Sequence, residues 1–254
     1  MLRKSTSSDT AVMNIIPAQG HGRRFLERKR RMVAALEAVI ERGITTGKYV
    51  QGSCVAALEE RIEERWNVAA AIAVNSGSSA LRLAFESLRI EAGREVLVPA
   101  LTFISTAYAV SDAGLVPVFV DVDPQTLTID PIAAQAAMTE KTAAIVPVHL
   151  HGQMAEMHSL LDLADTYGLY VIEDAAQAHG ATFTFSSNEY ARYAGSLGDL
   201  GCFSLNGVKN MGGLGDGGMV TVSARLLARD RAVADRLRGM RDLERASSRH
   251  RGPL

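Results

Sequence analysis

The sequence predicts an α/β fold, a mainly parallel sheet with helices on both of its faces. Short apolar runs alternate with stretches of helical periodicity along the chain, as expected for repeated strand–helix units. The apolar runs are continuous, which is typical of strands buried on both faces. With 254 residues, 47% of them hydrophobic, the chain can bury the core of one large domain or of two small ones.

The elements follow from this alternation. Residues 1–25 contain much Ser and Thr and are expected to form a flexible arm before a large domain at 26–240. Helical spacing marks 30–43, with Gly43 as the expected stop, and 54–66. The expected strands are 69–74, 95–100, 116–122, 143–150 and 169–174, then short runs near 202 and 219, and the intervening helices are 80–90, 104–114, 130–138 and 157–168. Polar residues 182–199 indicate an exposed loop, and the arginine-rich helical stretch after Ala224 is expected to fray at 241–254.

Composition excludes several classes of function. The net charge of -1 provides no general field for nucleic acid or an anionic membrane. Apolar runs are far shorter than the ~20 residues that span a bilayer, and the opening residues lack a signal-peptide core. Cys54 and Cys202 have neither disulfide-framework nor metal-site spacing. These features predict a protein of the cytoplasm without a metal.

Strand ends are where ligands bind in open parallel sheets. After the first strand, Gly77 and Ser78 open a helix whose free N–H groups could hold a phosphate. An ordinary serine helix cap is an equally good interpretation. The stretch matches neither a P-loop nor G-x-G-x-x-G, which disfavours a nucleotide-binding protein.

Two other strand exits carry chemistry-bearing side chains. Asp174 ends a buried strand, where a carboxylate needs a partner, and it could pair with a cationic ring nitrogen or serve as a structural ion-pair residue. Phe103 could stack on a planar ligand or belong to the core. His179, beside Gly180, fits a packing residue better than a catalytic base.

Lys209 lies in a glycine-rich stretch, "CFSLNGVKNMGGLGDGGMV", five residues after Ser204. So many glycines indicate either a flexible turn or a tight arch that holds an amine in place. A lysine held near an acid can form a Schiff base with an aldehyde. Pyridoxal 5'-phosphate needs such a lysine, an acid for its ring nitrogen, phosphate donors and an aromatic wall, so this set of strand ends favours that cofactor.

Longer motifs carry a family resemblance. In order, "NSGSSAL", "EVLVPALTFISTAYAV", "GLVPVFVDVDPQTLTIDP", "AAIVPVHLHGQMAEM", "VIEDAAQAHGA", "GSLGDLGCFS" and "KNMGGLGDGG" resemble the DegT/DnrJ/EryC1/StrS family of PLP-dependent sugar aminotransferases. The resemblance covers most of the chain. It implies a fold-type I large domain and a homodimer with sites at the subunit interface. It also implies amino transfer from glutamate or glutamine to a keto sugar, usually on a nucleotide, in amino-sugar and polysaccharide biosynthesis.

By matching position, the resemblance also implies roles for single residues. Lys209 would be the Schiff-base lysine, and Asp174 would pair with the pyridinium nitrogen. Gln177 would hydrogen-bond the cofactor's phenolic oxygen, and Phe103 would stack on its ring. Ser204 and the turn at Gly77 and Ser78 would hold the phosphate.

Some positions depart from the family pattern. Ser78 stands where threonine is usual, "LNGV" replaces a common aromatic–proline pair, and "GDGG" replaces "GEGG". The family's C-terminal small domain has no recognisable counterpart here, so poor activity and an exposed apolar docking surface are expected of the chain alone. The alternative is a catalytically impaired member that binds or regulates a partner. The family's sugar dehydratases carry histidine in place of the lysine, so Lys209 argues against that branch.

Overall fold

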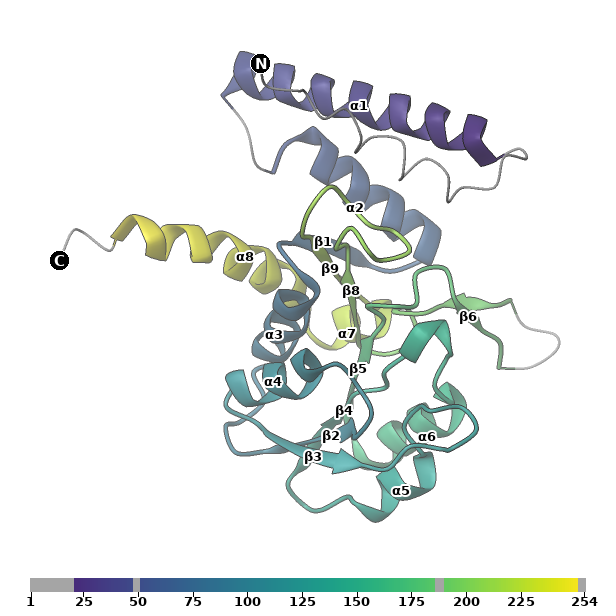
Figure 1. Cartoon of the computed structure of the whole chain (residues 1–254). Coiled ribbons are helices and arrows are strands. Elements are labelled where there is room, and N and C mark those ends of the chain that lie inside the picture. The colour runs from purple at the N-terminus through teal and green to yellow at the C-terminus, as the bar shows by residue number, and fades with distance from the viewer. Residues whose placement is uncertain (1–20, 48–50, 186–189, 251–254) are drawn as a thin grey trace, which may run out of the picture. The chain divides into compact units, whose positions relative to one another are not determined.

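The computed structural model describes residues 21–47, 51–185 and 190–250, and the chain divides between Ala56 and Ala57 into two compact units (Figure 1). The first unit holds helix α1 (His21–Thr46) and the start of helix α2 (Ser53–Trp66). Both helices confirm the periodicity of the sequence. The expected stop at Gly43 was wrong, because α1 continues to Thr46 and closes at Gly47, whose φ is 67° and whose N–H bonds to the Gly43 carbonyl.

The second unit is built on a seven-stranded sheet in the order β1-β9-β8-β5-β4-β2-β3. Its strands are β1 (Ala70–Val74), β2 (Glu95–Pro99), β3 (Val116–Val120), β4 (Thr142–Ile145), β5 (Tyr170–Asp174), β8 (Leu200–Ser204) and β9 (Gly218–Val222). Pairs from β3 through β2, β4 and β5 to β8 are parallel, while β9 is antiparallel to both β8 and β1. The predicted mainly parallel sheet is therefore confirmed.

Helices cover both faces of this sheet (Figure 1). Helices α3 (Gly77–Leu88), α4 (Ile104–Asp112) and α8 (Val233–His250) contribute to one core, and α5 (Pro131–Ala136) and α6 (Met157–Tyr167) to another. Along β2, Val96 and Val98 belong to the first core and Leu97 to the second. Alternate side chains point to opposite faces of a strand. Both faces are buried here, which explains why the strand runs are continuously apolar.

Helix starts in the sheet unit are set by side-chain caps. Ser76 accepts a hydrogen bond from the Ser79 N–H at the start of α3. Asp130 accepts one from the Ile132 N–H at the start of α5, which opens on Pro131. Ser223 caps the short helix α7 (Ala224–Arg229). These caps satisfy N–H groups that have no partner within the helix, so they fix where each helix leaves the sheet.

The segment 182–199 differs from the exposed loop expected there. Strands β6 (Thr182–Phe183) and β7 (Arg192–Tyr193) pair in a small antiparallel sheet, and residues 194–199 are buried. The cause is Glu173, which is wholly buried on β5 and accepts hydrogen bonds from the N–H groups of Gly195, Leu197 and Gly198. A buried carboxylate requires donors, and this outwardly polar segment supplies them.

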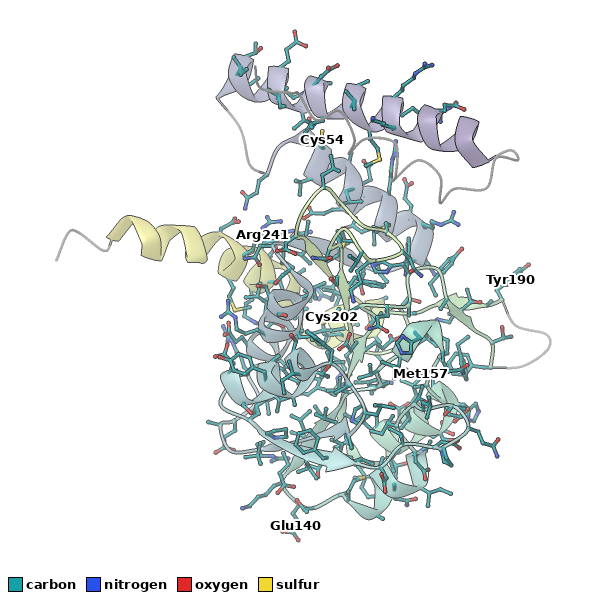
Figure 2. The ribbon with its side chains drawn as sticks, in the orientation of Figure 1. Cys54, Glu140, Met157, Tyr190, Cys202 and Arg241 are labelled. Atoms are coloured by element: carbon teal, nitrogen blue, oxygen red, sulfur yellow. The ribbon has the colours of Figure 1, made fainter. Side chains whose placement is uncertain are left out.

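Other expectations concern the termini, cysteines and membranes. Residues 21–25 and 241–250 are helical, 1–20 and 251–254 lie outside the described residues, and the domain boundaries at 25 and 240 stay predictions. Cys54 and Cys202 are free thiols; Cys202 and Met157 lie in the interior (Figure 2). Within the described segments, no helix is both long and apolar enough to cross a membrane.

Candidate active site

A pocket of about 370 Å³ lies at the ends of the strands in the second unit. We call it the strand-end pocket. All seven residues singled out in the sequence contribute to its lining: Gly77, Ser78, Phe103, Asp174, Gln177, Ser204 and Lys209. These residues come from segments spread over more than half of the chain, so it is the parallel sheet that brings them together.

One wall of the pocket is the start of α3 against the end of β8. A Cβ added at Gly77 would lie 2.8 Å from the Ser204 Cβ, closer than side chains tolerate. Glycine therefore allows the helix start to reach the strand end. Free N–H groups of the first turn and the hydroxyls of Ser78 and Ser204 meet at this corner. Such a corner suits a phosphate.

A second wall comes from the segment that leads into α4. Phe103 is the N-cap residue of that helix, lines the pocket and is 67% exposed. Two residues later, Ser105 places its hydroxyl 2.8 Å from the Ser78 hydroxyl. Because Phe103 is so exposed, it is not a core residue of this unit, and its open ring remains available to a planar ligand.

Asp174 forms the buried end of the pocket and is only 6% exposed. Its Oδ2 accepts a hydrogen bond of 2.8 Å from the Thr106 hydroxyl, and its Oδ1 accepts one of 3.1 Å from the Ala176 N–H. Burial raises the pKa of this carboxyl, while these hydrogen bonds and the nearby charge of Lys209 oppose the rise. The acid would gain most from a cation placed in the pocket.

Lys209 stands on the arch between β8 and β9 and is half-buried. The backbone N–H of Lys209 donates to the Asn206 carbonyl at 2.8 Å. The side-chain Nδ2 of Asn206 donates to Asp216 Oδ1 at 2.6 Å across the base of the arch. A Cβ at Gly212 would lie 2.7 Å from the Gly207 carbonyl oxygen, so the arch folds tightly on itself. The structure therefore shows an ordered turn around the lysine.

Gln177 and His179 follow Asp174 on the same connection. The side-chain oxygen of Gln177, which lines the pocket, accepts the backbone N–H of His151 at 2.8 Å, so its NH₂ group is left for another partner. His179 instead packs its ring 5.2 Å from that of Phe203. Burial and the nearby charge of Lys209 lower the pKa of His179, which favours the neutral ring of a packing residue.

Sequence reasoning missed three residues around Asp174: Thr106, His149 and Glu173. His149 is fully buried, with Nε2 2.9 Å from Glu173 Oε2 and Nδ1 accepting the Ala155 N–H. Since Nδ1 accepts, the ring proton lies on Nε2 and is donated to Glu173. The expected strand over 143–150 placed His149 inside a strand. In the structure β4 ends at Ile145, so His149 lies in the connection that leaves the strand.

Together these groups match the chemical features of a particular type of ligand. The pocket offers an anion corner, an open aromatic ring, a buried carboxylate and a primary amine. A planar cationic ring that carries a phosphate and an aldehyde would meet each of them. Across the described residues, no three His, Cys, Asp or Glu side chains are grouped to hold a metal ion. Cys202 lies beside the site, but burial and two carboxylates raise its thiol pKa, so it is no thiolate nucleophile.

Comparisons with known proteins point the same way. A family model described as the DegT/DnrJ/EryC1/StrS aminotransferase family matches residues 30–252. The chain is 43% identical over 76% of its length to UDP-N-acetyl-3-dehydro-alpha-D-glucosamine 3-aminotransferase of Acidithiobacillus ferrooxidans, and covers 49% of that protein. The chain spans about half of the length of the curated relatives it matches.

Solved structures share the fold. S. venezuelae DesV in complex with a ketimine intermediate superposes with a TM-score of 0.72 at 37% identity, over 82% of this chain and 54% of that one. NtdA of Bacillus subtilis, with the cofactor PMP bound, superposes with a TM-score of 0.70 at 31% identity, over 82% of this chain and 44% of that one.

Proposed function

The chain belongs to the DegT/DnrJ/EryC1/StrS aminotransferase family, and on that premise we propose that it binds pyridoxal 5'-phosphate in the strand-end pocket and transfers an amino group to a keto sugar. The observation that carries the proposal is the convergence of Lys209, Asp174 and the Gly77–Ser204 corner on one pocket. The glucosamine-derivative relative supports a nucleotide-linked keto sugar as acceptor. Glutamate or glutamine is the proposed donor.

The residues present fit the cofactor. The first turn of α3, with the Ser78 and Ser204 hydroxyls, would bind its phosphate, and Phe103 would lie against its ring. Asp174 would accept a hydrogen bond from the protonated ring nitrogen. The Gln177 NH₂ group, which is left over after its oxygen binds the His151 N–H, would donate to the phenolic oxygen.

Lys209 has two proposed tasks. Its Nζ would hold the cofactor by condensing with the aldehyde, with release of water, and the amine, when free again, would carry the proton that leaves the donor Cα. When bound, pyridoxal phosphate supplies an electron-withdrawing ring that stabilises negative charge at the carbon that loses this proton. Asp174 sustains that electron demand by keeping the ring nitrogen protonated, and Phe103 would cover one face of the ring from water.

We also propose that two copies associate around the pocket. Phe103 lines the pocket, and the large apolar side chains of Ile104 and Tyr108 follow it on α4; the three are exposed to 67%, 71% and 65%. Exposed clusters of large apolar side chains commonly mark interfaces. A second copy on these side chains would cover the open ring of Phe103. Sedimentation equilibrium measures the mass directly, and a monomer at all concentrations would contradict this part of the proposal.

The test of function is the donor half-reaction. The protein is loaded with pyridoxal phosphate, mixed with glutamate or glutamine, and followed by its absorbance. We expect conversion to the pyridoxamine form together with release of the matching keto acid. Lys209→Ala serves as the control and should convert far more slowly than wild type. A wild-type spectrum unchanged by either donor would support the alternative, an impaired member that only binds or regulates a partner.

A further inference from the structure

Three residues of the segment Thr102–Thr106 line the strand-end pocket, Thr102, Phe103 and Ser105, and Thr106 contacts Asp174 behind them. Phe103 forms a wall and Ser105 meets Ser78, as described above. The Thr102 and Thr106 hydroxyls lie 2.7 Å apart, and Thr106 reaches Asp174 Oδ2 at 2.8 Å. Thr106 is wholly buried. The Thr106 hydroxyl is therefore a buried donor to Asp174, the buried carboxylate that lines the described pocket. The proposed function gives this hydroxyl no role.

The direction of these hydrogen bonds is fixed by proton counting. A threonine hydroxyl has one proton and two lone pairs. An ionised Asp174 can only accept, so Thr106 donates its proton to Asp174. The contact of Thr102 with Thr106 must then be a donation from Thr102 to Thr106. The two hydroxyls therefore form a chain with a single direction, from Thr102 through Thr106 to Asp174 Oδ2.

The hydrogen bond from Thr106 also determines which acceptor sites of the Asp174 carboxylate stay available to a ligand. Each carboxylate oxygen takes one donor from the protein, Thr106 on Oδ2 and the Ala176 N–H on Oδ1. An ionised carboxylate has about four acceptor sites, so sites remain for a cationic N–H in the pocket. Both protein donors are held by local structure. Thr106 sits in the first turn of α4, where its own N–H bonds to the Phe103 carbonyl at 3.0 Å.

We infer that Thr106 is a positioning residue that keeps Asp174 ionised and aimed into the pocket, with Thr102 orienting the Thr106 hydroxyl. The inference rests on the proposed function, in which Asp174 accepts a hydrogen bond from the protonated ring nitrogen. The titratable groups around Asp174 are Glu173 of its own strand, Cys202 of β8, His149 after β4 and Lys209 of the arch. Thr106 and Ala176 are the uncharged donors among these neighbours.

The experiment compares four variants. Thr106→Val has nearly the same shape but lacks the hydroxyl, and Thr106→Ser keeps it. Thr102→Val removes the second hydroxyl of the chain. Thr128→Val is the matched control, because Thr128 is also buried but pairs its hydroxyl with that of Thr126 at 2.9 Å, and not with Asp174. Each protein is measured for pyridoxal phosphate affinity and, without cofactor, for unfolding by urea between acid and neutral pH.

We expect graded losses of cofactor affinity. Thr106→Val should bind roughly tenfold more weakly, the factor expected for losing a hydrogen bond to a charged group. Thr102→Val should lose about threefold, as for a neutral hydrogen bond. Thr106→Ser and Thr128→Val should match wild type. Without cofactor, the destabilisation of Thr106→Val should grow as pH rises above the ordinary aspartate range, because an ionised Asp174 has lost a donor.

The outcomes separate the inference from the function it rests on. Wild-type protein that does not bind pyridoxal phosphate overturns the proposed function itself. If wild type binds and Thr106→Val binds equally well, the positioning role is wrong. A loss of stability in Thr106→Val that is the same at every pH would show a packing role only, and would also overturn the inference.

Discussion

Asp174 and Lys209 face the same pocket but are held in opposite ways. Asp174 ends a central strand, is 6% exposed and receives donors on both oxygens. Lys209 stands on an exposed arch whose neighbours include Val208 at 87% exposure, and the arch is closed by the pair Asn206 and Asp216. The acid is fixed by the core of the sheet, and the lysine by a few hydrogen bonds of one loop.

Because of this difference, the effect of a charge in the pocket can be measured separately from the effect of the position of the amine. Changes around Asp174 alter the charge of a buried group, so their effects should depend on pH. Changes in the arch alter where the amine stands, so their effects should fall on cofactor binding with little dependence on pH. The predictions below test this contrast, from the largest expected effect to the smallest.

Removing the amine should have the largest effect. Lys209→Ala should lower the rate of the donor half-reaction by about 10²–10⁴-fold, the range for losing a general acid–base group. Stopped-flow absorbance measures the rate, and a small added amine should restore part of it. Lys141→Ala, at an exposed site before β4, is the control. Equal rates in the two variants would remove Lys209 from the chemistry.

Neutralising the acid should change the pH dependence of stability. Burial raises the pKa of Asp174 in the folded protein above its unfolded value near 3.9, so the folded state binds the extra proton in that interval. Wild-type stability therefore falls as pH rises from about 4 toward the raised pKa, and Asp174→Asn lacks this fall. Urea unfolding of cofactor-free protein across this interval should show the variant gaining relative to wild type while losing cofactor affinity.

The opposite pH trend for Asp174→Asn would mean that the hydrogen bonds from Thr106 and Ala176 outweigh burial, and would contradict a raised pKa for Asp174. Asp174→Glu keeps the charge with a longer side chain. It should retain the fall in stability with pH and still bind the cofactor poorly, because the longer carboxylate no longer fits both donors.

Crowding the helix corner should have an intermediate effect. Gly77→Ala places a Cβ 2.8 Å from the Ser204 Cβ, so the helix start or the strand end must move at a cost of about 1–3 kcal/mol. Gly239→Ala is the matched control, because a Cβ there meets nothing within 4 Å, and alanine in a helix should stabilise by about 0.5–1 kcal/mol. Thermal unfolding and phosphate-competition binding would measure both effects, and equal behaviour would refute the close approach.

Opening the base of the arch should have the smallest effect. Asn206→Ala removes the 2.6 Å hydrogen bond to Asp216, which is worth about 1 kcal/mol or less at this exposed position. Cofactor affinity should fall a few-fold, global stability should hardly change, and the effect should be similar at all pH values. A strongly pH-dependent loss would erase the contrast between the arch and the acid.

Sequence alone predicted the sheet and the placement of the pocket because both follow from periodicity. Continuous apolar runs marked buried strands, and chemistry-bearing residues at their ends, such as Asp174 and Phe103, were bound to meet at one edge. The roles of these residues were suggested by their types and positions and made specific by the family resemblance, and they stay predictions. The antiparallel pairing of β9 was not predicted, since periodicity does not encode strand direction.

What the sequence could not show were contacts made across elements. Thr106 looks like an ordinary helix residue, and only the packing of α4 against β5 brings its hydroxyl to Asp174. Glu173 precedes Asp174 and points to the other side of the strand, where the backbone of residues 195–198 supplies its donors. Neither the contact of Thr106 with Asp174 nor that of Glu173 with residues 195–198 can be predicted from neighbouring residues, because the partners lie about 20 to 70 positions apart in the sequence.

The most direct test is covalent trapping of the cofactor. The purified protein is mixed with pyridoxal 5'-phosphate, reduced with borohydride, digested and mapped by mass spectrometry. The sequence offers Lys4, Lys29, Lys48 and Lys141 as competing lysines. We predict a single labelled peptide that carries Lys209, with labelling blocked by added phosphate. Label spread over the other lysines, or absent from Lys209, would contradict the central claim that this arch and Asp174 form one cofactor site.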